Sequence, residues 1–123
     1  MDKMAMYRLS YGVFVLTARE SDKDNGCIIN TAIQAASAPN QLSICVNKGN
    51  CTHDMILRTG RFTVSVLSQS ADFNIFRHFG FQSGREVNKF EAFEQCERGE
   101  NGIYYITGGS NAYISVKVNR LST

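Results

Sequence analysis

A strict alternation of apolar and hydroxyl residues follows Gly60, in the stretch RFTVSVL at residues Arg61–Leu67. Phe62, Val64 and Val66 fall on one face, and hydroxyl side chains fall on the other. A period of two residues is typical of a β-strand with one face on a core. This stretch therefore favours a fold built on a sheet.

Other short segments have the same character, since they are rich in β-branched and aromatic residues. The further predicted strands are residues 11–19, 27–32, 42–46, 103–107 and 112–118. Turns are predicted at 21–26, where Asn25-Gly26 is a hairpin dipeptide, and at Gly108-Gly109. Residues 35–40 are expected to form a crossing segment that contains Pro39.

Short helices are predicted between some of these strands. Asn50 or Thr52 can cap a helix that ends near residue 59, with Gly60 as its stop. Ser70 opens a second helix over 71–79, and residues 3–9 form a third. The helices do not alternate regularly with the strands, so the sequence predicts a mainly β fold: a small, mostly antiparallel barrel with short helices.

Length and composition narrow the class of protein. The chain has 123 residues, 43% of them hydrophobic, which suits a single domain spanning 1–123 with a real core. Its net charge is +2 and the basic residues are spread along the chain, so we expect no nucleic-acid partner. No apolar stretch has the length of a membrane span, and we expect a cytoplasmic protein. The four cysteines form no C-x-x-C pair, so no metal site is predicted.

The first segment with chemical capacity is NTAIQAAS, residues 30–37, which combines hydroxyls, amides and small residues without formal charge. Small residues allow a flat ligand to approach the backbone closely, and Thr31 or Ser37 can bond a phosphate or a ring carbonyl. The other reading is a barrel corner whose hydroxyls bond locally. Composition alone favours the corner.

The second segment is NKGNCTH, residues 47–53, between a predicted strand and a helix N-terminus. The amides of a helix N-terminus together with Lys48 would make an anion site suited to phosphate. A solvated loop with an ordinary cap is an equally good reading. His53 by itself is more typical of a helix surface than of a base.

The third segment is FGFQSGREVNKF, residues 79–90, which places Arg85 and Lys89 among aromatic residues. Two cations beside aromatic rings could clamp a phosphate and cover a planar ring. An exposed loop is the favoured reading of this segment alone. Tyr104 and Tyr105, in a fourth segment, are expected in a core or at a dimer surface.

No nucleophile–base pair, G-x-S-x-G elbow, G-x-G-x-x-G motif or P-loop is present. The chain instead offers hydroxyls, amides and a few cations, which is what a phosphorylated planar cofactor requires. If the protein is an enzyme, its cofactor carries the reaction, and no catalytic residue is predicted.

The segments together resemble a known family. YGVFVLTA, then NGCIINT and its following S-x-P, LSICVNKGNCTHDMI, GRFTVSVLS and FGFQSGREVNKF occur in the order and spacing seen in flavin reductase-like proteins. These are FMN-binding split barrels, and the flavoredoxin type is the most similar branch, including the flavin domain of high-molecular-weight rubredoxins. The resemblance covers nearly the whole chain.

The resemblance implies a homodimer of six-stranded antiparallel split barrels with one flavin per subunit. It implies that residues 30–37 lie along the isoalloxazine and ribityl chain, that residues 47–53 hold the phosphate, and that residues 79–90 close over the site. The cofactor-binding residues it predicts are Asn30, Thr31, Gln34, Ala36, Ser37, Asn47, Lys48, Asn50, Thr52, His53, Phe79, Arg85 and Lys89.

The implied function is a flavoprotein oxidoreductase. Electrons from NAD(P)H would pass through bound FMN, preferred over FAD, to free flavin, rubredoxin or another iron protein. The family usually continues beyond the strand at 112–118, so the resemblance implies that C-terminal barrel strands are missing and that turnover with NAD(P)H is in question. The alternative is therefore a non-catalytic flavin-binding electron carrier, and a third reading is a barrel that has lost its cofactor.

Overall fold

The computed structural model describes residues 13–37, 40–68, 73–80, 82, 87–91 and 93–118, with the backbone alone at 33–37, 40, 73 and 111. The elements in chain order are β1 (Phe14–Glu20), β2 (Lys23–Ile29), β3 (Ala32–Ser37), β4 (Asn40–Ile44), α2 (Cys51–Thr59), β5 (Arg61–Leu67), α3 (Phe73–Gly80), β6 (Cys96–Arg98), β7 (Tyr104–Ile106) and β8 (Ser110–Lys117). The helix predicted at 3–9 lies outside the described residues, as do Pro39 and Ser70, the residue predicted to open the helix at 71–79.

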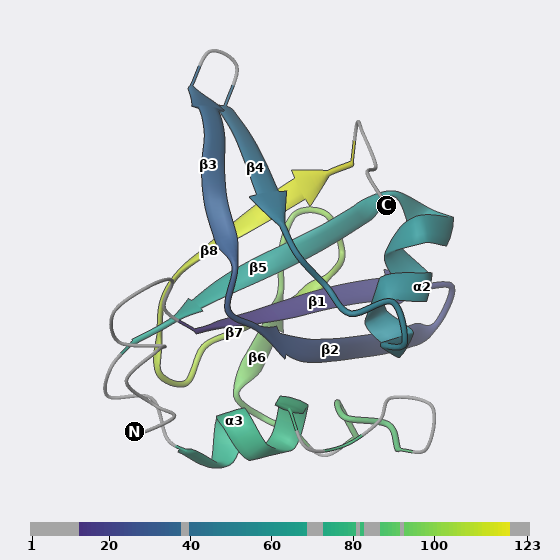
Figure 1. Cartoon of the computed structure of the whole chain (residues 1–123). Helices are drawn as coiled ribbons and strands as arrows, with labels where there is room; N and C mark the ends of the chain where they lie inside the picture. The colour runs from purple at the N-terminus through teal and green to yellow at the C-terminus, as the bar shows by residue number, and fades with distance from the viewer. Residues whose placement is uncertain are drawn as a thin grey trace.

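The strands form one four-stranded sheet and two hairpins (Figure 1). The sheet has the order β2-β1-β5-β8, while β3 pairs with β4 and β6 with β7. All of these pairings are antiparallel. The mainly β, antiparallel architecture with short helices is therefore confirmed. Each of the six predicted strands is present, and β3 and β6 are additional.

Two local predictions in the first half of the chain are wrong. The turn between β1 and β2 lies at Ser21-Asp22, where Ser21 has a φ of 55°. Asn25 and Gly26 instead belong to β2, paired with β1. Residues 35–37 of the expected crossing segment instead complete the strand β3, and Asn40 begins β4. The two backbones pair although the small residues have little strand preference of their own.

Helix α2 begins and ends as predicted. The Asn50 side chain accepts a hydrogen bond from the Thr52 amide, which is the usual role of an N-cap. Gly60 has a φ of 74° and its amide donates to Ile56 O, which closes the helix in a left-handed cap.

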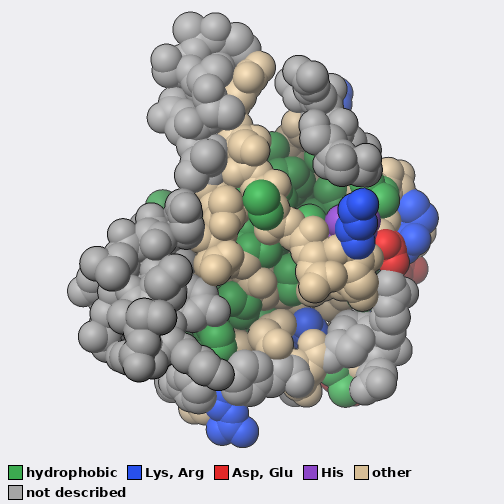
Figure 2. Space-filling model, viewed as in Figure 1, with side chains coloured by type: hydrophobic (Ala, Val, Ile, Leu, Met, Phe, Trp, Pro, Cys, Tyr) green, Lys and Arg blue, Asp and Glu red, His purple; other side chains and the backbone are tan. Residues whose placement is uncertain are grey.

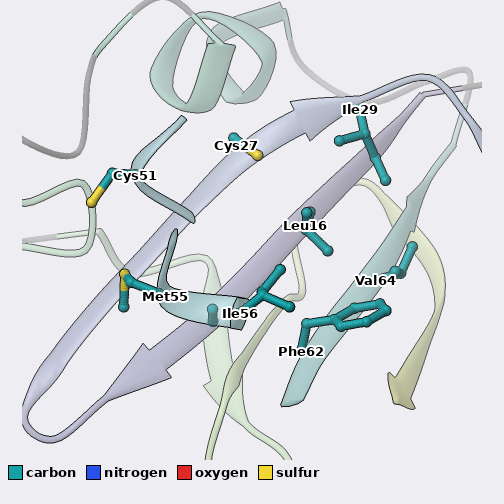
Figure 3. Packing of buried hydrophobic residues seen from close by; sticks show 9 residues of the cluster. Leu16, Cys27, Ile29, Cys51, Met55, Ile56, Phe62 and Val64 are labelled. Atoms are coloured by element: carbon teal, nitrogen blue, oxygen red, sulfur yellow. The ribbon is translucent and has the colours of Figure 1, made fainter. Parts of the chain in front are cut away.

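The first of two core clusters lies between α2 and the four-stranded sheet (Figure 3). Met55 and Ile56 of α2 meet Leu16 of β1, and Phe62 and Val64 of β5 contribute from the next strand. The predicted apolar face of β5 is thus confirmed.

The opposite face of the sheet is also buried, which the alternation did not predict. Thr63 and Ser65 are 1% and 0% exposed. Asn101 Nδ2 donates to Thr63 Oγ1 at 3.1 Å, and Ile106 N donates to Ser65 Oγ at 3.0 Å. The segment around β7 covers this face, and the hydroxyls of Thr63 and Ser65 are satisfied by hydrogen bonds to that segment.

The second core cluster joins α3 to β1 and β7, with Val15, Ile75, Phe79 and Ile106 fully buried. Gly26 allows the close approach of α3, since a Cβ at Gly26 would lie 3.1 Å from the Phe79 ring. None of the helices in the described ranges is long and apolar enough to cross a membrane.

Candidate functional site

The turn before α2 is organised by asparagine side chains. Asn47 Oδ1 accepts from Gly49 N at 2.8 Å, and Asn47 O accepts from Asn50 N at 3.0 Å. Asn50 then uses its side chain for the Thr52 amide, at 2.8 Å, and its carbonyl for the Asp54 amide, at 3.4 Å. These hydrogen bonds fix the conformation of the turn and thus the orientation of the first-turn amides of α2.

The presented N-terminus is suited to an anion. The amides of Cys51 and His53 have no intrahelical acceptor at these first-turn positions, and the helix dipole places partial positive charge there. Lys48 is exposed in the same turn. His53 Nδ1 lies 3.2 Å from Asp54 Oδ1, so its ring is held by its neighbour.

The connection between β2 and β3 is hydrogen-bonded to the segment that leads into this turn. Asn30 is exposed and its Oδ1 accepts from Thr31 Oγ1 at 3.4 Å. Thr31 O accepts from Cys45 N at 3.3 Å, which ties the start of β3 to the segment just after β4. The structure therefore ties the beginning of the first predicted segment to the chain that leads into the second, two residues before Asn47.

The remaining predicted residues of the first segment follow β3 away from this point. Gln34 pairs with Leu42, and after a register shift Ala36 pairs with Gln41 and Ser37 with Asn40. The β3–β4 hairpin projects from the body of the molecule in Figure 1. Figure 2 shows hydrophobic side chains in a hollow of this face, with Lys and Arg side chains near its edge.

The third predicted segment is buried at its two ends, whereas Gly80, Gln82, Val87 and Asn88 between them are exposed as expected of a loop. Phe79 is 1% exposed, and its ring centroid lies 5.3 Å from that of Phe90 and 5.2 Å from that of Phe93. His78 adds a bond from its Nε2 to the carbonyl of Lys89. Phe79 is thus a core residue with the half-buried Phe90 packed against it, and Phe81 and Arg85 lie outside the described residues.

Lys89 is a buried lysine, 2% exposed. Its Nζ donates to Gly26 O at 2.7 Å and to Phe79 O at 2.9 Å, so the ammonium joins β2 to the end of α3. Burial lowers the pKa of Lys89, and the nearby thiols of Cys27 and Cys51 oppose this only in part. Within the described part of the chain, no carboxylate forms an ion pair with Lys89.

A set of polar groups beneath the first turn of α2 was missed by sequence reasoning. Asn25 and Thr52 are 1% and 0% exposed, and Cys27 beside them is 2% exposed. Burial raises the pKa of the Cys27 thiol to about 11, although the Thr52 hydroxyl and Asn50 side chain oppose the rise. The available signal was the alternation of Lys23, Asn25 and Cys27, which places all three on one face of a strand.

The described residues of the predicted set therefore fall into three groups. Seven lie at the α2 N-terminus and at the β2–β3 connection, which the bond between Thr31 and Cys45 links, three follow β3, and Phe79 and Lys89 pack with α3. Among the described residues, no group of three or more His, Cys, Asp or Glu side chains could hold a metal ion.

Comparison with known proteins bears on this arrangement. The family described as "Flavin reductase like domain" matches residues 6–122. A high molecular weight rubredoxin from Moorella thermoacetica is 34% identical over 120 residues, which cover 98% of this chain and 52% of the rubredoxin. A ferric-chelate reductase (NAD(P)H) from Archaeoglobus fulgidus is 36% identical over 118 residues, covering 96% of this chain and 69% of the reductase. This chain thus spans about half the length of the first relative.

Among solved structures, an FMN-binding protein from Thermus thermophilus superposes with a TM-score of 0.83 at 23% identity, covering 95% of this chain and 64% of that one. The likeness confirms the fold expected from the resemblance, a split barrel.

Proposed function

Because this chain belongs to the flavin reductase-like domain family, we propose that it is a flavoprotein oxidoreductase that binds FMN and passes electrons from NAD(P)H to an acceptor. The acceptor classes are free flavin, rubredoxin or another iron protein. The two relatives named above, a rubredoxin and an NAD(P)H-dependent reductase, support electron transfer of this kind.

The observation that carries the proposal is the capped N-terminus of α2, whose preceding segment is hydrogen-bonded at Cys45 to the β2–β3 connection. A flavin mononucleotide needs an anion site for its phosphate and uncharged hydrogen-bonding groups along its chain and ring. First-turn amides and exposed Lys48 provide the first, and Asn30 and Thr31 provide the second at the adjoining segment. The residues present therefore fit the cofactor.

We assign roles to the described side chains by their surroundings and to the others by the resemblance alone. Lys48 and the amides of α2 would hold the phosphate, while Asn47 and Asn50 keep the turn in shape through their hydrogen bonds. His53 lies at the same turn, and Thr52 is buried beneath it. Gln34, Ala36 and Ser37 would follow the ring and ribityl chain along β3, and Arg85 would add positive charge.

Phe79 and Lys89 would support the site without contacting the flavin. Phe79 packs in the core, and the Lys89 ammonium is held by two carbonyls, so both would support the site by fixing β2 and α3. The bound flavin would supply the redox chemistry, and the protein would orient it and restrict access of water.

We further propose a homodimer in the cytoplasm, with no nucleic-acid or membrane partner. The apolar side chains along the face of β8 support a second copy, because Ile114 is 45% exposed there.

The test is the visible absorption spectrum of the purified protein, followed by anaerobic addition of NADH and then NADPH. Flavin bands that bleach with a nucleotide are the expected result. Bands that do not bleach would favour the electron-carrier alternative. A colourless protein that fails to take up either FMN or FAD would overturn the proposal. If the protein binds both flavins, the one with the higher affinity identifies the cofactor.

A further inference from the structure

Two buried side chains lack hydrogen-bond partners. The Asn25 carboxamide has neither its Nδ2 nor its Oδ1 satisfied, and the Thr52 hydroxyl is also unpaired. The two residues are 1% and 0% exposed. Buried polar groups are almost always hydrogen-bonded, to protein or to ordered water, because leaving them unpaired is costly.

The two side chains face the same layer, between β2 and α2. Lys23 and Cys27 flank Asn25 on its face of β2, and each approaches the first turn of α2. Lys23 Nζ donates to Cys51 Sγ at 3.9 Å. The Thr52 hydroxyl lies close enough to the Cys27 thiol to lower the pKa of that thiol, without the geometry of a hydrogen bond. Asn25 therefore lies beneath the first turn, between these two contacts, and Figure 3 shows Cys27 on β2 and Cys51 at the start of α2.

The chemistry of the unpaired atoms selects the ligand. Asn25 offers N–H donors and a carbonyl acceptor, and the Thr52 hydroxyl can both donate and accept. An anion would leave Asn25 Oδ1 unmet, and a metal cation would leave Asn25 Nδ2 unmet. A water molecule can donate and accept at once and is small enough to be buried.

We propose that an ordered water molecule binds beneath the first turn of α2, bridging the Asn25 carboxamide and the Thr52 hydroxyl. The bridge joins β2 to the turn that Asn50 caps. It would thus fix the direction in which the α2 amides point, as a positioning element for the anion site. This last consequence rests on the proposed function, whereas the water site itself does not.

The direct test is a crystal structure of the whole chain at a resolution that shows ordered water. The expected result is a water oxygen within hydrogen-bonding distance of both the Asn25 side chain and Thr52 Oγ1. A direct bond between the two side chains, or a dry contact, would overturn the inference.

Unfolding in urea gives an independent test on Thr52→Val, Asn25→Leu and the double variant. If both residues bind one water, each single change lowers the midpoint and the double change lowers it no further than the more severe single one. A Thr52→Val midpoint equal to or above wild type, or strictly additive losses, would mean that no shared water exists. Ser65→Ala is the control: its hydroxyl accepts from Ile106 N, so its loss should add to that of Asn25→Leu.

Flavin titration separates the two proposals. If the wild type binds FMN, we expect weaker binding by Thr52→Val, with a loss of several-fold. An affinity equal to wild type would remove the positioning role. If the wild type binds no flavin, the proposed function fails, while the crystal structure and the urea midpoints still decide the water site.

Discussion

Lys48 and Lys89 show how two residues of one type, both predicted to meet a flavin, can have different roles. Lys48 is exposed in a turn, so its charge is free to attract a ligand. Lys89 is buried and its ammonium is shared between two carbonyls. The first should therefore affect binding, and the second should affect stability.

Replacing Lys48 by alanine should weaken FMN binding by about 1–3 kcal/mol, because a charge-assisted bond to phosphate is lost. Stability should change little, since the side chain is exposed. Titration followed by flavin fluorescence measures the affinity, and Lys117→Ala removes another exposed lysine on β8 as a control. Equal affinities of Lys48→Ala and wild type would remove Lys48 from the site.

Replacing Lys89 by methionine should lower the free energy of unfolding by about 1–3 kcal/mol, because Gly26 O and Phe79 O lose their donor while the cost of burying a charge is also removed. Urea unfolding measures the change against Lys117→Met. A variant as stable as wild type would show that the two carbonyls need no donor.

Cys27 should make stability depend on alkaline pH. Its pKa is raised from 9.0 to about 11 in the folded chain by burial, so the folded state keeps the proton when the unfolded state has lost it. The contribution is complete below pH 9.0 and is lost as the pH rises through about 11, by about 3 kcal/mol in total. Lys89 opposes this trend, since its pKa is lowered.

The measurement for Cys27 is the free energy of unfolding between pH 9 and 11 in wild type and in Cys27→Ala. The variant should lose less stability over this range, whatever its stability at neutral pH. Cys45→Ala removes an exposed cysteine and serves as the control. Parallel curves for wild type and Cys27→Ala would show that the thiol does not titrate differently on folding.

At the scale of elements, α2 could be predicted to its ends because both of its caps, Asn50 and Gly60, are local signals. The Asn25-Gly26 dipeptide is also a local signal, but pairing with β1 outweighs it and moves the turn to Ser21. The position of Lys89 could not be predicted, because its partners are backbone carbonyls, one of them 63 residues away in sequence. Every residue has a backbone carbonyl, so the residue types do not indicate which carbonyls accept from Lys89.

The packing of α3 on β2 depends on Gly26. A methyl group there would lie 3.1 Å from both the Phe79 ring and the Thr17 methyl, so the aromatic ring or the strand must move. Gly26→Ala should therefore cost about 1–3 kcal/mol of stability. Gly99→Ala is the matched control, since its new methyl would meet its nearest atom at 3.5 Å. Equal thermal midpoints for the two variants would contradict the proposed close packing.

At the scale of the whole molecule, β8 forms one of the two outer edges of the four-stranded sheet, and no described strand pairs with it on its outer side. Ile114 of β8 pairs with Val64 and shares its face of the sheet, yet Val64 is 1% exposed and Ile114 is 45% exposed. The apolar surface of the first core cluster therefore continues outward onto β8. Such an edge invites pairing, and a second copy of this chain is the partner that we propose.

If a second copy covers this face, a charge at Ile114 should separate the subunits, since it would be buried without a partner. We expect Ile114→Asp to shift the mass in sedimentation equilibrium from dimer toward monomer at micromolar concentration. Leu57→Asp introduces the same charge at an apolar side chain that is 49% exposed, on α2, and should leave the dimer intact. Dissociation by both variants would point to general instability, and a dimer that survives Ile114→Asp would place the interface elsewhere. A dimer lost only with Ile114→Asp would assign the β8 face to the contact between subunits.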